Sequence, residues 1–302
     1  MTSLSAQPAE DAKMNRLPRG LPFTALCAVS LIAWMRPLLA TFTLTAVDDR
    51  YTHILLIIPV VIALIVQRWR ERGYKPQVWA GGASLLLLSL FVATVGWFSG
   101  ASSDVRLAVE MTGLVIWWIG SFLLCFGRPA LAAFPFSLFF LFAAVPIPII
   151  LLDKIVAGLQ QASILAAQFI FLLFRIPVSR DGTILTIPGL DIDVTPECSS
   201  IRSSLMLLVT TMVLTHLLLN KTWRQILVVA IAIPLSVAKN GLRIFVIGML
   251  GSRVDPAYLT GNLHHHGGIV FFLIALAAIF LLLWFLRRGE ERAPSTSILE
   301  SS

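Results

Sequence analysis

The sequence predicts an all-α polytopic membrane protein with about eight transmembrane helices and one short extracytoplasmic β-hairpin. Of its 302 residues, 57% are hydrophobic and only 13% are charged. Soluble domains carry about a quarter charged residues, so this composition indicates that lipid surrounds most of the chain. Nine apolar runs approach or reach the roughly 20 residues that cross a bilayer, near 22–43, 54–67, 78–98, 107–126, 131–150, 155–174, 199–219, 226–250 and 267–286.

The basic residues lie in short clusters between the apolar runs rather than in one patch. This distribution is typical of cytoplasmic loops and favours membrane topology over nucleic-acid binding as the reason for the net charge of +7. The apolar runs are therefore assigned to one transmembrane domain over 21–288. We expect residues 1–20 and 289–302 to form cytoplasmic tails.

Charge and crossing number together orient the helices. Arg224 and Arg287 read as cytoplasmic, so the helices at 199–219 and 267–286 should begin at the opposite, extracytoplasmic face. A cytoplasmic N-terminus then requires an odd number of crossings before residue 199, and one of the six earlier runs must fail to span. The run at 155–174 contains three glutamines, which suits an interfacial or re-entrant helix.

One stretch does not have a helical pattern. Residues 183–187 and 190–194 each alternate apolar and polar side chains, and Pro188-Gly189 separates them. Alternation on both sides of a turn signal predicts a β-hairpin. It would lead directly into Cys198.

Cys198 stands apart from the other two cysteines, which lie inside apolar runs. Its polar surroundings, Thr195-Pro-Glu-Cys-Ser-Ser, begin a helix. A thiol at a helix N-terminus is favoured as thiolate by the helix dipole, and Arg202, four residues on, shares its face. Cys198 is therefore the candidate nucleophile.

Arg243 lies within an apolar helix, where an arginine is costly unless it is paired or lines a polar cavity. Asn240, three residues earlier, lies on the same helical face and could orient it. The alternative is an arginine that snorkels to the interface. Lys239 is less specific and could be structural.

His264, His265 and His266 precede the last apolar run. Adjacent histidines point in different directions, so they cannot all serve one site, and no second ligand run supports a metal. One of them acting as acid or base beside a thiolate is the more economical interpretation. His53, at the start of an earlier helix, has either a capping or a functional role.

Together these residues suggest acyl transfer without a cofactor. A thiolate attacks a peptide carbonyl, a histidine moves protons, and an arginine stabilises the oxyanion or orients the substrate. The alternative is a multi-span transporter or polysaccharide-export component, with Arg243 and His264 lining a substrate path. The sequence shows no inverted repeat of the kind that many transporters carry.

From about residue 48 to 272, the chain resembles the exosortase/archaeosortase family of membrane transpeptidases. Five features match in order. Tyr51-Thr-His53 is similar to the family's Tyr-Ser-His, and Pro146-Ile-Pro148 with Leu159-Gln-Gln161 is similar to its central segment. Cys198-Ser-Ser-Ile-Arg-Ser203 resembles its Cys-Ser-Gly-Ile-Arg-Ser, Asn240-Gly-Leu-Arg-Ile244 its Asn-x-x-Arg-Ile, and His264 with Gly268 its His-x-x-x-Gly.

The resemblance implies a Cys198/Arg243/His264 site facing the periplasm from a bacterial cytoplasmic (inner) membrane. Such enzymes cleave exported proteins at a C-terminal tripartite signal of the PEP-CTERM type, and the acceptor could be an exopolysaccharide or a lipid-linked molecule. Two features depart from the family pattern. Ser200 replaces the usual glycine, and His265 is the fallback for the third site residue.

Overall fold

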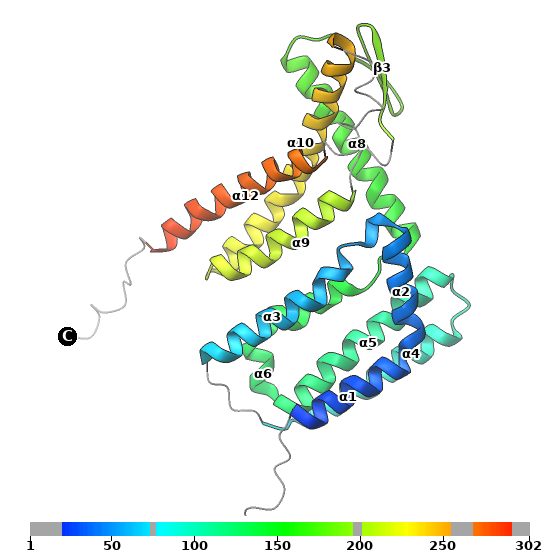
Figure 1. The fold of residues 1–302 in the computed structure, drawn as a ribbon, viewed down its shortest axis with the longest axis vertical. Helices are drawn as coiled ribbons and strands as arrows, with labels where there is room; N and C mark the ends of the chain where they lie inside the picture. The colour runs from blue at the N-terminus through cyan, green and yellow to red at the C-terminus, as the bar shows by residue number, and fades with distance from the viewer. Residues whose placement is uncertain (1–19, 73–76, 196–200, 255–267, 292–302) are drawn as a thin grey trace, which may run out of the picture. The chain divides into compact units, whose positions relative to one another are not determined.

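The computed structural model describes residues 20–72, 77–195, 201–254 and 268–291 (Figure 1). The chain divides into two compact units, one of residues 1–48 and 54–148, the other of residues 49–53 and 149–302. Two of the predicted catalytic residues, Cys198 and His264, lie outside the described residues, as do most of both predicted tails.

Among its described residues, the first unit contains helices and no β-strand. It contains α1 (Gly20–Ala33), α2 (Met35–Val47), α3 (Ile54–Arg72), α4 (Gly81–Phe98), α5 (Ser103–Phe126), α6 (Arg128–Ala133), α7 (Pro135–Phe140) and the 3₁₀ turn η3 (Leu141–Ala144). Helices α1 and α2 are bent by 72° at their junction. Pro37 lies in the first turn of α2, where a proline is tolerated because the N–H groups there have no intrahelical partner.

Tryptophan side chains tie α5 to the N-terminal helices. The Nε1 of Trp34 donates to the Glu110 carbonyl at 2.9 Å, and the Nε1 of Trp117 donates to the Leu26 carbonyl at 3.0 Å. A third indole, that of Trp118, donates to Ser30 Oγ at 2.9 Å. These bonds satisfy the polar atoms of large side chains that are otherwise packed in apolar surroundings.

The run at 131–150, which the sequence suggested as one span, is not a single helix. It is broken into α6, α7 and η3, followed by an extended stretch up to Pro148. Prolines at 135, 146 and 148 explain the breaks because each removes a backbone donor and restricts the preceding residue. Among the described residues, seven helices are long and apolar enough to cross a membrane, or eight if α1 and α2 form one bent span. The expectation of about eight spans is thus confirmed.

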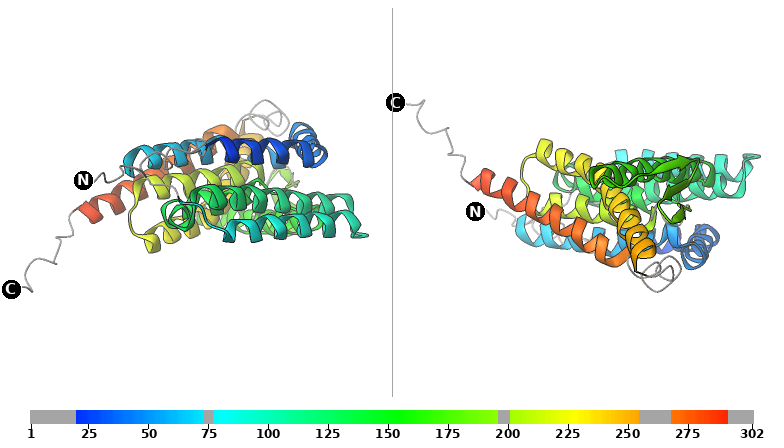
Figure 2. Two further views of the ribbon diagram at one scale, coloured as in Figure 1. Left: turned by 90° about the horizontal axis from the view of Figure 1, so that it is seen from below. Right: turned by 90° about the horizontal axis from the view of Figure 1, so that it is seen from above.

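The second unit contains three helices that pack along one long helix. Its elements are the 3₁₀ turn η2 (Asp49–Tyr51), α8 (Ile149–Leu173), β1 (Ser179–Asp181), β2 (Ile184–Ile187), β3 (Leu190–Asp193), α9 (Ile201–Leu218), α10 (Thr222–Arg253) and α12 (Gly268–Glu291). Helices α8, α9 and α12 all contact α10 (Figures 1 and 2).

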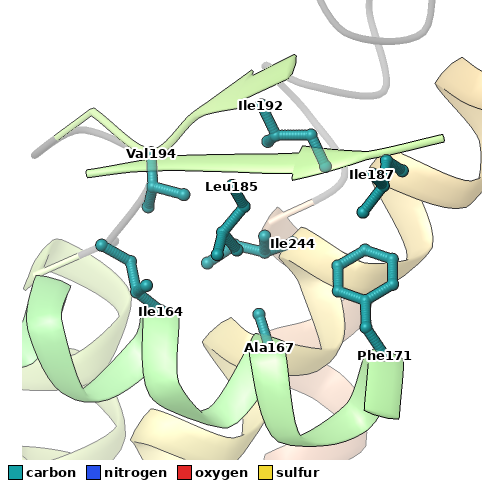
Figure 3. Packing of buried hydrophobic residues seen from close by; sticks show 8 residues of the cluster. All are labelled: Ile164, Ala167, Phe171, Leu185, Ile187, Ile192, Val194 and Ile244. Atoms are coloured by element: carbon teal, nitrogen blue, oxygen red, sulfur yellow. The ribbon is translucent and has the colours of Figure 1, made fainter. Parts of the chain in front are cut away.

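The predicted β-hairpin is confirmed, with one strand more than expected. Strands β2 and β3 pair antiparallel from Ile184↔Asp193 to Ile187↔Leu190, and β1 adds a third strand beside β2. The two-residue turn has Gly189 at φ +83°, the left-handed value that the third position of a type II turn after proline requires. The inward side chains of the sheet pack on α8 and α10 (Figure 3), in a cluster of Ile164, Ala167, Phe171, Leu185, Ile187, Ile192, Val194 and Ile244.

Helix α8 ends in a turn that directs the chain into this sheet. Arg175 adopts φ +57°, and the backbone N–H of Ile176 donates to the Phe171 carbonyl while that of Arg175 donates to the Leu172 carbonyl. This is the hydrogen-bond pattern of a Schellman motif, in which glycine is the usual left-handed residue. An exposed arginine takes that position here.

Contacts along α10 show which part of it each neighbour covers. Leu286 at the end of α12 lies beside Arg224, and Ser203 at the start of α9 lies beside Lys239. At about 1.5 Å per residue, the stretch from Thr222 to Arg243 is roughly 33 Å long, close to the thickness of a bilayer core. The close contacts of α8 and the sheet lie at Gly241 and Gly248, at and beyond the other end of this stretch. Helix α8 is nevertheless one of the helices that are long and apolar enough to cross a membrane, so the expectation that 155–174 does not cross stays a prediction.

Near Arg224, at the beginning of α10, Glu290 binds the turn between α9 and α10. Its carboxylate accepts the backbone N–H groups of Asn220 at 2.9 Å and Lys221 at 3.2 Å, and it lies 3.6 Å from Arg224 Nη1. Arg224 also donates to the Leu286 carbonyl at 2.7 Å. These contacts of Glu290 and Arg224 fix the position of α12 along the axis of α10.

The close contact between α10 and α8 yields a stability prediction. A Cβ on Gly241 would lie 2.6 Å from Ala166 Cβ and 2.9 Å from the backbone nitrogen of Ala167. Gly241→Ala should therefore force the helices apart and lower the stability of the second unit by about 1–3 kcal/mol. Thermal unfolding in detergent measures this.

Gly158→Ala is the matched control because it makes the same change in the exposed middle of α8. A Cβ there would meet no atom within 4 Å, and alanine is the better helix former. Its melting temperature should stay level or rise. Equal melting temperatures for the two variants would contradict the close helix contact.

Candidate functional site

A polar face runs along α10 in the second unit. Ser236, Lys239, Asn240 and Arg243 recur at helical spacing, so they lie on one side of the helix. Their exposed fractions are 4%, 5%, 0% and 7%, and all four are buried. Buried cations in an apolar helix are expensive and mark a functional site by default.

The first turn of α9 docks on this face through two hydrogen bonds. Ser236 Oγ donates to Ser204 Oγ at 2.6 Å, and Lys239 Nζ donates to Ser203 Oγ. Hydroxyl pairs of this kind join membrane helices where backbones approach closely. The start of α9 is thereby held against α10, next to the chain that carries Cys198 three residues before Ile201.

Arg243 of α10 lies beside the first residue of α12. A Cβ placed on Gly268 would be 3.9 Å from Arg243 Nη1, so the guanidinium sits beside the first residue of that helix. His264 precedes Gly268 by four residues in the chain and lies outside the described residues, as does His265. The predicted arginine therefore lies beside the residue at which α12 begins, four positions after His264 in the sequence.

Arg202 lies exposed at the start of α9, where an ion pair holds it. Its Nη1 lies 2.8 Å from Asp49 Oδ2, and the neighbouring Arg50 in η2 lies 3.1 Å from Asp153 Oδ1 at the start of α8. The short turn η2 thus joins the beginnings of two helices. Both pairs are exposed, so each contributes little stability and chiefly fixes geometry.

His53 follows the same turn and is buried, with 6% of its surface exposed. Its Nδ1 lies 3.2 Å from the Arg50 carbonyl oxygen. Tyr51, two residues before it, is 2% exposed. His53 is thus packed against η2, and the choice between a capping and a functional role stays a prediction.

Gln160 anchors the strand that leads toward Cys198. Its side chain is 7% exposed, and Nε2 donates to the Val194 carbonyl at 2.5 Å. Val194 lies one residue beyond β3 and four before Cys198. A buried amide of α8 therefore fixes the last part of the chain that the structure describes before the candidate nucleophile.

Sequence reasoning found Arg202 but missed its partner Asp49, and it missed the Arg50–Asp153 ion pair and the hydrogen bond from Gln160 to Val194. The two residues of each pair are separated by long stretches of chain, so no spacing rule could pair them. Lys239, which the sequence left as less specific, shares one buried face with Ser236, Asn240 and Arg243, and the four follow a helical period. Within the described ranges, no cluster of three or more His, Cys, Asp or Glu side chains could hold a metal ion.

Comparison with known families assigns the chain to a class of membrane protein-sorting enzymes. The model of the transmembrane exosortase family (Exosortase_EpsH) matches residues 34–281, which cover most of both units. The chain belongs to the transmembrane exosortase family. Searches of curated proteins and of solved structures found no match.

The Gln160 bond yields a testable prediction. Gln160→Leu keeps the side-chain volume but removes the donor to a buried carbonyl, which should cost about 1–3 kcal/mol. Hydrogen exchange at the end of β3 should also become faster. Both can be measured on the purified chain in detergent.

Gln161→Leu is the control because Gln161 is the exposed neighbour on the same helix, where it accepts a hydrogen bond from Arg180. Its effect on stability should stay within about 0.5 kcal/mol. If both variants behaved alike, the Gln160 anchor would be disproved.

Proposed function

We propose that this chain is a membrane-embedded cysteine protease or transpeptidase that cleaves C-terminal sorting signals of the PEP-CTERM type from exported proteins. Its site would face the periplasm from a bacterial cytoplasmic membrane. Cys198 is the nucleophile, His264 moves protons, and Arg243 stabilises the oxyanion or orients the substrate. Membership of the exosortase family supports the protein-sorting part of this proposal.

One observation carries the assignment of the site. Arg243 is 7% exposed, lies beside the first residue of α12, and belongs to the polar face that holds the first turn of α9. The chains that carry Cys198 and His264 enter the described structure as α9 and α12. A buried guanidinium near the first turns of α9 and α12 can stabilise the negative charge that develops on a substrate carbonyl oxygen.

The reaction proceeds in two steps. The Cys198 thiolate attacks the scissile carbonyl carbon, a C–S bond forms, and the negative charge moves to the carbonyl oxygen, where Arg243 stabilises it. The C–N bond then breaks and the leaving amine takes a proton from the histidine. Water or an amine of an acceptor attacks the thioester in the second step, gives its proton to the histidine and releases the thiolate.

The electrostatics near α9 support thiolate chemistry. The N-terminus of α9 carries the positive end of a helix dipole, and Lys239 and Arg202 lie in or beside its first turn. Positive charge of this kind favours the thiolate form of a cysteine in the same segment. Asn240 lies on the same buried face, one turn before Arg243. The acceptor could be water, an exopolysaccharide or a lipid-linked amine.

Replacement of Cys198 tests the proposal. Cys198→Ala should abolish processing, a loss of roughly a thousandfold or more, because no other group would form the acyl intermediate. Mass spectrometry of exported proteins from cells with the active or the substituted chain reads the new C-termini. Unchanged processing by the alanine variant would rule out Cys198 as nucleophile.

A second comparison tests which histidine acts. His264→Ala should reduce processing about 100-fold or more, whereas His265→Ala should leave most of it intact. The same C-terminal readout serves both variants, and membrane levels of each protein control for folding. The reverse order would assign the role to His265, and full activity in both would count against either role.

A further inference from the structure

Lys239 is a buried cation that the roles of Cys198, Arg243 and His264 do not require. Its side chain is 5% exposed, and its Nζ donates to Ser203 Oγ. A hydroxyl satisfies one of the three ammonium donors but brings no negative charge. A serine or asparagine could hold α9 equally well, so the ammonium charge itself needs an explanation.

The surroundings of Lys239 add further positive charge. Arg243 is one turn away on the same buried face, and the N-termini of α9 and α12 lie beside these two cations. Within the described part of the chain, no acidic side chain forms an ion pair with Lys239; the nearby Asp49 is exposed and pairs with Arg202. A buried ammonium group such as that of Lys239 is costly unless a negatively charged group pairs with it.

We propose that Lys239 binds a carboxylate of the peptide substrate while Arg243 serves the oxyanion, which deepens the proposed function and rests on it. Residues four apart on a helix have Cβ atoms roughly 6 Å apart, so one bound substrate can contact both cations. Both side chains are nearly closed to solvent and lie between packed helices. A single acidic side chain of an extended peptide adds few atoms to such a site, whereas a phospholipid headgroup carries its acyl chains with it.

The test is a binding cycle on the full chain in detergent. In the Cys198→Ala background, binding is separated from cleavage. The probes are short synthetic peptides from the sorting segment of an exported protein of the same cell, each with one acidic residue replaced by its amide. One such replacement should weaken binding roughly 30-fold when Lys239 is present. In Lys239→Gln the same replacement should change binding by no more than about threefold.

Four protein variants separate charge from packing. Lys239→Gln can keep a hydrogen bond to Ser203 without the charge, and Lys239→Arg keeps the charge, so only the arginine variant should retain discrimination between acid and amide. Ser236→Ala loosens the contact between α9 and α10 but should leave that discrimination intact. Lys154→Met, which removes an exposed lysine of α8 in the same unit, should behave like the parent.

The outcomes divide the two proposals. Two results would overturn the Lys239 subsite alone. One is that the Lys239 and peptide changes affect the binding affinity independently, and the other is that the parent binds acid and amide peptides equally. Loss of bound anionic lipid from Lys239→Gln with unchanged peptide binding would assign the charge to lipid instead. If no sorting peptide binds the parent, both proposals fail; if cleavage persists in Cys198→Ala, only the nucleophile does.

Discussion

The second unit depends on the burial of two cations on one face of α10. Lys239 and Arg243 are almost completely enclosed, in a helix whose other side chains are largely apolar. Such charges remain ionised only when hydrogen-bond partners and nearby dipoles replace water. The first turns of α9 and α12 must therefore lie where they do, and the hydroxyls of Ser203 and Ser204 complete that environment on the side of α9.

The rest of the unit holds these first turns in register. At one end of α10, Glu290 and Arg224 fix α12 and the turn after α9. At the other end, the sheet packs on α8 and α10, and Gln160 fixes the strand end. The apolar clusters hold the helices together, while these few polar contacts set their positions along the axis. Rigid support of this kind is what a site built from several chain segments needs.

Sequence reasoning recovered the features that depend on local pattern. Hydropathy gave most of the long helices, alternation around Pro188-Gly189 gave the hairpin, and the position of Arg243 in an apolar run indicated its burial. The break in 131–150 was visible as three prolines, but the length of the apolar run outweighed them. Strand β1 is short and polar, so only its pairing with β2 reveals it. The ion pairs of η2 arise from tertiary packing and leave no mark in the local sequence.

The turn η2 has a consequence for how the protein can be divided. Residues 49–53 belong to the second unit, whereas the segments before and after them belong to the first. The chain consequently passes between the units three times, once on each side of η2 and once after Pro148. No single cut in the chain can release either unit intact. A chimaera that exchanged only residues 149–302 would bring α8 and α9 without their native Asp49 and Arg50, so the two halves must be inherited, or engineered, together.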